Sequence, residues 1–247
     1  MIHSPVDAGF VALLGLIFGS LGSALSHRLP RGLPVVADRS RCPACGQDLG
    51  ARDLIPVLSW IVQGGRCRHC HAPISWRYPA IEATTSVLFI AAWLVGGGLN
   101  PRAFLLALTG FGLVVISVAD LEEGVIPDVM LLFLLPVAAA WRHVTAGSWI
   151  DGAMGAAFGV GASLFLRWAF SRLRGVDALG LGDVKFFGLA GLYLGLSGFG
   201  HFLAIGGVIG IVSGLAWRAA GRGPTFPFAP ALSATLAAIL FFGVPGR

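Results

Sequence analysis

Eight stretches of the chain are dominated by apolar residues, and shorter polar segments separate most of them. A helix needs about 20 apolar residues to cross a bilayer, and the stretches are close to that length, although some are shorter. The pattern predicts an all-α polytopic membrane protein with about eight transmembrane helices, at roughly 8–26, 80–97, 103–119, 129–146, 152–170, 185–199, 202–220 and 228–244.

One long polar segment, residues 27–78, interrupts this pattern between the first two apolar stretches. It divides the chain into three predicted parts: a first transmembrane helix at 1–26, an insert at 27–78 and a seven-helix membrane core at 79–247. No basic segment precedes the first apolar stretch, as it would in a secretory signal peptide. We therefore expect the first helix to be a retained anchor.

Composition and charge support a membrane location and give an orientation. The 247 residues are 56% hydrophobic and 12% charged, whereas a soluble domain carries about 25% charged residues. Eight of the 17 basic residues lie in the insert: Arg28, Arg31, Arg39, Arg41, Arg52, Arg66, Arg68 and Arg77. Because positively charged loops stay in the cytoplasm, the insert is predicted to be cytoplasmic and the N-terminus external. This bias largely accounts for the net charge of +5, so no nucleic-acid partner is expected.

All four cysteines of the chain lie in the insert, in two C-x2-C pairs: Cys42, Cys45, Cys67 and Cys70. Two such pairs supply the four thiolates of a tetrahedral zinc site, and Gly46 would help the first turn to close. A reducing cytoplasm argues against disulfides. Four protein ligands leave no open position, so the predicted zinc is structural. Four metal-free thiols, or replacement of a cysteine by His69 or His71, are the alternatives.

Two carboxylates are predicted to meet at the cytoplasmic ends of two different helices. Asp120 ends one apolar stretch, and Asp183 begins another after the glycines Gly180 and Gly182. Two carboxylates in a low-dielectric site share a proton, so that one activates water while the other polarises a scissile carbonyl. The glycines are expected to form a hinge that lets a substrate backbone approach Asp183. Proton or ion transport is the alternative use of this pair.

Five other charged residues receive more ordinary interpretations. Glu122 and Glu123 are expected to be solvated, with a hypothetical role in attracting a basic substrate segment. Asp128 follows a proline and is expected to cap or orient a helix. Lys185 either pairs with a carboxylate or, as we favour, marks the cytoplasmic boundary. Asp151 is expected to be an external, solvated helix N-cap.

The motifs together resemble the type IV prepilin peptidases, also called leader peptidase/N-methyltransferases, within the G-x-G-D class of intramembrane aspartic proteases. The similarity runs along nearly the whole chain and includes the two cysteine pairs. Its segments are "GSLGSALSHRLP" at 19–30, "RDLIPVLSWIVQGGRCRHCHAPISWRYPAIEATT" at 52–85, "ADLEEGVIPD" at 119–128, "GLGDVKFFGLAGLYLG" at 180–195 and "FPFAPALSATLA" at 226–237. Ala229 stands where the family usually has glycine, and the insert is short for the family.

The resemblance implies a bacterial inner-membrane enzyme that cleaves the leader of type IV prepilins or pseudopilins at the cytoplasmic face. It implies that Asp120 and Asp183 are catalytic. It also implies methylation of the new N-terminus by S-adenosylmethionine, an activity associated with the insert and with Gly65. Pilus assembly and type II secretion both remain open as the pathway.

Three functions of other classes fit these residues less well. The "GLSG" at 195–198 matches the rhomboid serine-protease pattern, but a catalytic serine needs a histidine from another helix, and His201 lies on the same predicted outer side. A transporter could use Asp120 and Asp183 as a proton relay, and a catalytically silent assembly scaffold would use neither. Neither of these last two would make a cleavage product.

Overall fold

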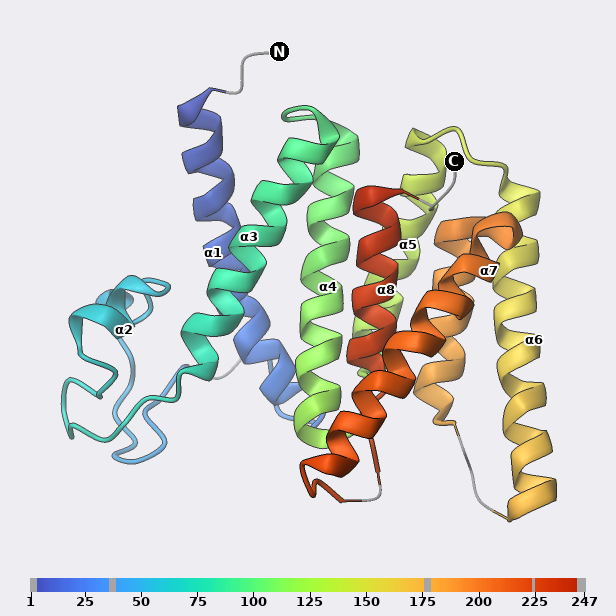
Figure 1. The fold of residues 1–247 in the computed structure, drawn as a ribbon. Coiled ribbons are helices and arrows are strands. Elements are labelled where there is room, and N and C mark those ends of the chain that lie inside the picture. The colour runs from blue at the N-terminus through green and yellow to red at the C-terminus, as the bar shows by residue number, and fades with distance from the viewer. Residues whose placement is uncertain (1–3, 36–38, 176–178, 224, 244–247) are drawn as a thin grey trace.

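The computed structural model describes residues 4–35, 39–175, 179–223 and 225–243, and these residues form helices and loops without a β-strand. The long helices of this described part of the chain, α1 and α3 to α8, stand side by side, and the insert with its short helices projects from one side of them (Figure 1). The elements are α1 Pro5–Arg28, the 3-10 helix η1 Ala51–Asp53, α2 Leu58–Val62, α3 Arg77–Gly96, α4 Pro101–Glu123, α5 Asp128–Val144, α6 Trp149–Arg174, α7 Leu181–Ala219 and α8 Ala229–Phe242.

Five helices are long and apolar enough to cross a membrane: α1, α3, α4, α6 over Trp149–Leu173, and α7. Helix α8, with 14 residues, is a shorter apolar helix of the same bundle. Local sequence signals set several boundaries. Asn100 caps α4 through a hydrogen bond from the Ala103 N–H at 2.9 Å, with proline following, and left-handed glycines end α3 and α4. The chain is therefore a multi-pass membrane protein, as predicted.

Two of the predicted membrane stretches belong to one interrupted helix, α7. The prediction separates them at residues 200–201, but the chain turns at Gly195, whose φ of 70° and ψ of 172° are not helical. The first half of α7 runs up the bundle and the second half runs back down (Figure 1). A side chain at Gly195 would overlap the carboxylate of Asp151. Glycine is required there for both its backbone conformation and its size, so eight membrane segments are formed.

Arg142, at the end of α5, holds this turn together. Its guanidinium is buried and donates hydrogen bonds to the carbonyls of Leu192 and Tyr193 at 3.1 and 3.3 Å. It also forms an ion pair with Asp151 at 3.3 Å. The expectation that Asp151 is a solvated N-cap is wrong, because Ser148 caps α6. Asp151 instead neutralises a buried arginine beside the break in α7.

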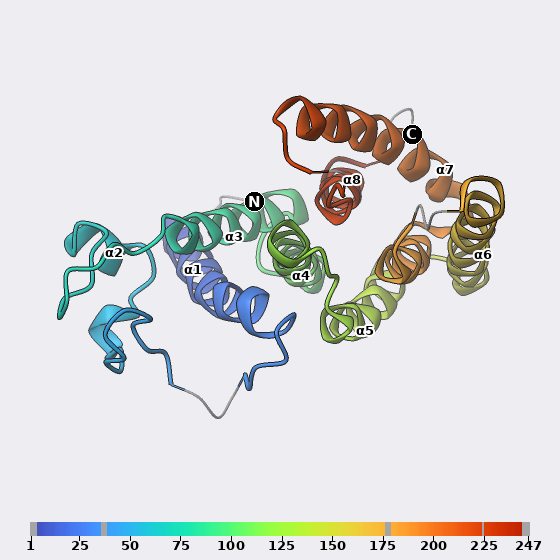
Figure 2. The same ribbon diagram turned by 90° about the horizontal axis from the view of Figure 1, so that it is seen from below.

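Helix α4 lies at the centre of the bundle and packs on α1, α3, α5 and α8 (Figure 2). Leu106, Val115, Ile116 and Ala119 on this helix are fully buried. Arg77 ties α3 to two neighbours: it donates to the Ser23 carbonyl and the Ser26 hydroxyl of α1, and it pairs with Glu122 at the end of α4. The ends of α4 and α1 are thereby held at the same end of the bundle as the start of α3.

Helices α6 and α7 pack through glycines without intervening side chains. A methyl group added at Gly155 would lie 2.5 Å from the Gly191 carbonyl oxygen and 2.7 Å from the Gly195 carbonyl carbon. Small residues at such a crossing allow two membrane helices to approach closely. The same addition at Gly161, also in α6, meets no atom within 4 Å.

The Gly155→Ala variant should therefore lose stability, by about 1–3 kcal/mol, because backbone atoms cannot rotate away from the new methyl group. Gly161→Ala is the matched control and should unfold at or above the wild-type temperature. Thermal unfolding of the two purified variants in the same detergent provides the measurement. Equal midpoints would contradict the close glycine contact.

Candidate active site

Asp120 lies in the last turn of α4 and is buried, with 7% of its surface exposed. Its Oδ2 accepts a hydrogen bond of 2.8 Å from the backbone N–H of Ala229, the first residue of α8. The first N–H groups of a helix have no partner within the helix, so they are available to a carboxylate. The start of α8 thus satisfies one oxygen of a buried carboxylate.

Asp183 lies in the first turn of α7, and its carboxylate is held in a similar way. The backbone N–H of Gly180, which caps α7, donates to Asp183 Oδ2 at 3.2 Å. Asp183 is close enough to Asp120 for their charges to interact. Each carboxylate is therefore oriented by a helix N-terminus, and the two act on each other.

Both aspartates line one pocket of about 460 Å³ at the end of the bundle where α4 ends and α7 begins. Its remaining walls come from the α4–α5 loop, the start of α7 and the segment after α1: Leu29, Pro30, Gly124, Val125, Ile126, Pro127, Asp128, Gly180, Leu181, Gly182 and Lys185. The structure therefore brings together the two residues that the sequence paired.

The two glycines before Asp183 provide space, which corrects the predicted backbone hinge. Gly180 has an ordinary φ of −67°, and Gly182 lies within the helix. A methyl group at Gly182 would lie 3.0 Å from the Ile126 side chain, and one at Gly180 would lie 3.1 Å from Asp183 Oδ2. Any larger residue at Gly182 would press on the α4–α5 loop that forms the opposite wall of the pocket.

The other charged residues near the pocket form ion pairs. Lys185 Nζ contacts both Asp128 oxygens, at 2.6 and 2.8 Å, so the interpretation of Lys185 as a boundary marker alone is wrong. The N-cap of α5 is Pro127, and Asp128 begins the helix without a capping bond from its side chain. Glu122 and Glu123 are exposed to solvent, as expected, and each also pairs with an arginine, Glu122 with Arg77 and Glu123 with Arg31.

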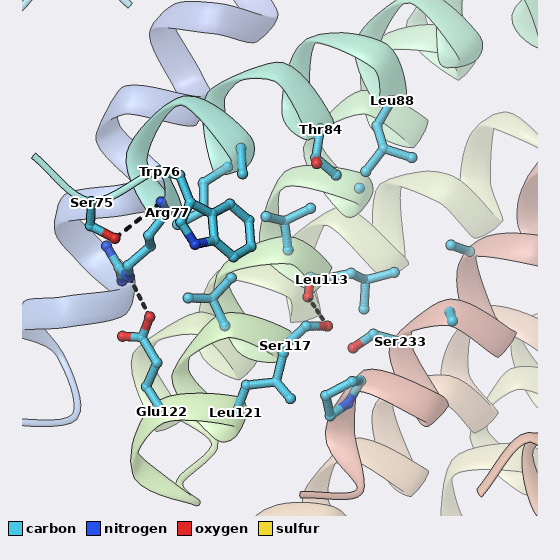
Figure 3. A pocket seen from close by; sticks show the side chains of 18 residues that line it. Ser75, Trp76, Arg77, Thr84, Leu88, Leu113, Ser117, Leu121, Glu122 and Ser233 are labelled. Atoms are coloured by element: carbon cyan, nitrogen blue, oxygen red, sulfur yellow. Dashed lines mark hydrogen bonds and ion pairs between the residues drawn. The ribbon is translucent and has the colours of Figure 1, made fainter. Parts of the chain in front are cut away.

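A second, larger pocket of about 650 Å³ lies between α3, α4 and α8 (Figure 3). Trp76, Leu88, Leu113 and Leu121 are among its apolar walls, and Ser117 and Ser233 lie near each other on one side. Neither Asp120 nor Asp183 lines it. Hydrolytic chemistry by paired carboxylates therefore belongs to the smaller pocket.

The four cysteines of the insert form one cluster, with their sulfur atoms all within 4.8 Å of one another. The Cys42 and Cys70 sulfurs are 3.9 Å apart, and a tetrahedral zinc with bonds of about 2.3 Å would separate its ligands by about 3.8 Å. Backbone N–H groups of Cys45 and Ala44 lower the pKa of the Cys42 thiol to about 7. The donor set fits a four-coordinate metal.

The two cysteine pairs have the same backbone fold. The Cys42 N–H bonds to the Gln47 carbonyl at 2.9 Å, and the Cys67 N–H bonds to the Ala72 carbonyl at 2.8 Å. The residue after each pair has a positive φ, 71° at Gly46 and 59° at His71. The predicted role of Gly46 in closing the first turn is confirmed.

Comparison with known proteins identifies the family. Residues 13–95 match the Bacterial Peptidase A24 N-terminal domain, and residues 104–245 match the Type IV leader peptidase family. The chain belongs to the type IV leader peptidase family. None of the solved structures matches it.

Relatives in this family cover nearly the whole chain. A Prepilin leader peptidase/N-methyltransferase of Burkholderia pseudomallei (strain K96243) is 35% identical across 99% of this chain and 88% of its own length. A protein of the same name from Bacillus subtilis (strain 168) is 37% identical, across 90% of this chain and 89% of its own. One from Pseudomonas aeruginosa is 31% identical, across 90% and 85%.

One residue of this leader peptidase that the sequence reasoning missed is Glu82 in α3. Its carboxylate is buried and accepts a hydrogen bond of 2.6 Å from the Val57 N–H in the insert. A carboxylate inside an apolar stretch is expensive unless it has a partner. That rule, applied to the predicted helix at 80–97, would have identified Glu82 from the sequence.

Gly65 has a structural reason to be glycine. Its φ is 67°, and an added methyl group would lie 2.9 Å from Cζ2 of Trp60. The Trp60 ring cannot move aside freely, because its Nε1 donates to the Ile74 carbonyl at 3.0 Å. The neighbouring Gly64 has a similar φ of 61°, but a methyl group there would meet nothing within 4 Å.

Gly65→Ala should therefore destabilise the insert more than Gly64→Ala. Both variants bear the cost of a positive φ, about 1–2 kcal/mol, but only the first displaces Trp60. Titration of the metal-loaded variants with a chelator measures the difference, and Gly65→Ala should lose metal at lower chelator concentration. Identical titrations would rule out the Trp60 contact as the reason for this glycine.

Proposed function

We propose that this chain is an intramembrane aspartic endopeptidase that removes the leader peptide of type IV prepilins or pseudopilins at the cytoplasmic membrane face. The observation that carries the proposal is the placement of Asp120 and Asp183 in one pocket, each held by a helix N-terminus. The names of the family relatives supply the substrate class.

The proposed reaction is hydrolysis by a shared-proton carboxylate pair. The ionised aspartate takes a proton from water as the water oxygen attacks the scissile carbonyl carbon. The protonated aspartate donates its proton to the carbonyl oxygen. Collapse of the tetrahedral intermediate breaks the C–N bond: one of its hydroxyl groups returns a proton to the second aspartate as the carbonyl re-forms, and the leaving nitrogen takes a proton from the first carboxyl group. The step needs no metal and no nucleophilic side chain.

The proposed orientation places the pocket and the insert in the cytoplasm of a bacterial inner membrane. One end of the bundle holds the end of α1, the start of α3, the end of α4 and both ends of α7 (Figure 1). Basic residues lie there: Arg28 ends α1, Arg77 begins α3 and Arg218 is in the last turn of α7. Positive charge gathered there favours the cytoplasmic side. We retain the three-part division at 1–26, 27–78 and 79–247.

We also propose N-methylation of the new N-terminus with S-adenosylmethionine as donor, because the relatives carry both activities in their names. The metal in this proposal is zinc, held by Cys42, Cys45, Cys67 and Cys70, and its role is structural. An insert of about 50 residues has little apolar core, so metal binding would supply much of its folding free energy. Gly65 is associated with methyl transfer by family resemblance.

Four charged residues are proposed to shape the substrate site: Glu122, Glu123, Asp128 and Lys185. These four residues take part in three ion pairs: Glu122 with Arg77, Glu123 with Arg31, and Asp128 with Lys185. Paired charges present little net potential to a basic leader, which weakens the hypothesis that the glutamates steer it. Asp128 and Lys185 line the pocket that holds the aspartates, and their proposed contribution is to fix its rim. Glu122 and Glu123 are proposed to hold the end of α4 in place through their arginines.

The test is cleavage of a co-expressed prepilin by the wild type and by Asp120→Asn and Asp183→Asn. Each substitution removes one ionisable group, so we expect each folded variant to lose at least about 100-fold in cleavage rate. Asp7→Asn, in the first turn of α1 at the other end of the bundle, is the matched control and should cleave normally. Mass spectrometry of the wild-type product should show one additional methyl group.

Cleavage by both variants at the wild-type rate would overturn the aspartic mechanism. A wild type that never cleaves would favour the transporter, in which the same aspartates relay protons, or the silent scaffold. A cleaved but unmethylated product would restrict the proposal to proteolysis.

A further inference from the structure

The part of the insert that contains α2 does not hang below the helices beside it, although other loops of the insert reach lower than the start of α3 (Figure 1). Figure 2, which views the bundle along its axis, shows the insert beside α1 and α3, outside the area that the long helices occupy. Figure 1 shows α2 level with the lower halves of α1 and α3, above the point where α3 begins. A domain lying wholly in the aqueous phase would extend beyond the helix ends instead.

A specific hydrogen bond fixes α2 at this height. Val57, the residue before α2, donates its N–H to Glu82 Oε2 at 2.6 Å. Glu82 lies five residues into α3, which begins at Arg77, so it is about 8 Å along the axis of that helix. The contact holds the start of α2 against the part of α3 that enters the membrane.

Helix α2 and the segment before it present aliphatic side chains outward. Leu58, Ile61 and Val62 are 55%, 61% and 74% exposed, and their i, i+3, i+4 spacing puts them on one face of the helix. Leu54 and Ile55 precede them and are also exposed. We call these five residues the aliphatic face of the insert.

The opposite side of α2 faces the rest of the insert. Trp60 lies over Gly65 and donates its Nε1 hydrogen to the Ile74 carbonyl. The large aromatic side chain of Trp60 thus packs on the rest of the insert, whereas the aliphatic side chains of α2 remain on its outer surface. This arrangement suits a helix whose outer surroundings are apolar.

We propose that the aliphatic face is immersed in the acyl chains of the bilayer leaflet on the side of the catalytic pocket. Helix α3, which the insert contacts at Glu82, also presents an exposed aliphatic side chain, Val87, which is 63% exposed. The exposed arginines Arg52 and Arg66 flank the face in sequence and can reach headgroup phosphates while their stems stay in apolar surroundings. The insert is thereby partly embedded in the membrane, and the hydrogen bond to Glu82 fixes its position along α3.

This inference goes beyond the proposed reaction and does not depend on it. It has one functional consequence: the cysteine cluster is held beside the membrane at a fixed position relative to α3, instead of moving on free linkers. Whatever the insert acts on must then reach it at the membrane surface.

The experiment uses the full-length protein in nanodiscs that contain labelled phospholipid. The photoreactive residue p-benzoylphenylalanine replaces Ile61 in one preparation. It replaces Val87 as the positive control and Gln47, an exposed polar position of the insert, as the negative control. After irradiation we expect lipid adducts at position 61 within about twofold of those at position 87, and at least fivefold above those at position 47.

A second variant tests the role of Glu82. Glu82→Leu removes the acceptor for the Val57 N–H, so lipid labelling at position 61 should fall several-fold, whereas labelling at position 87 should not change. Unchanged labelling at position 61 would overturn the assigned role of Glu82. Labelling at position 61 as weak as at position 47, or an adduct with a second copy of the chain instead of lipid, would overturn the proposal.

Discussion

The hydrogen bond from the Ala229 N–H to Asp120 is the contact on which the active-site end of the bundle depends. A carboxylate buried among apolar helices requires a donor, and the unpaired N–H groups at the start of α8 provide one without introducing a positive side chain. Asp183 uses the start of α7 in the same way through Gly180. Two helix N-termini therefore orient the pair, and the positive ends of their dipoles favour negative charge there.

Three positive side chains at this end of the bundle are paired with other acidic residues. Glu122 and Glu123 pair with Arg77 and Arg31, and Asp128 pairs with Lys185. Among the ion pairs of the residues that the structure describes, Asp120 and Asp183 take part in none. A dyad that must exchange protons is better served by neutral backbone donors than by a cation, which would hold both carboxylates ionised. At the opposite end, Arg142 performs a purely structural task by joining α5, α6 and the break in α7.

The sequence predicts the helices and the cysteine cluster, because apolar stretch length and ligand spacing are local properties. It predicts that Asp120 meets Asp183 because both lie at the same predicted end of their membrane helices. It does not reveal the ion pairs of Lys185 and Glu122, since each joins residues on different helices. The turn in α7 was placed a few residues too late, because Gly195 is one of several glycines in an apolar run and only the nearby Asp151 distinguishes it. The sequence also does not show why Gly180 and Gly182 are glycines. A glycine can be needed for a positive φ or because a side chain would not fit, and the structure shows the second reason here.

The central claim is that Asp120 and Asp183 act as one unit. A double-mutant cycle tests it most directly: initial cleavage rates of a purified prepilin are compared for the Asp120→Asn/Asp183→Asn double variant and the two single variants. Residues that act as a unit lose activity non-additively, so we predict that the double variant cleaves no more slowly than the slower single variant. Losses that multiply, with the double variant slower by the product of the two single effects, would show two independent contributions and contradict the shared-proton account.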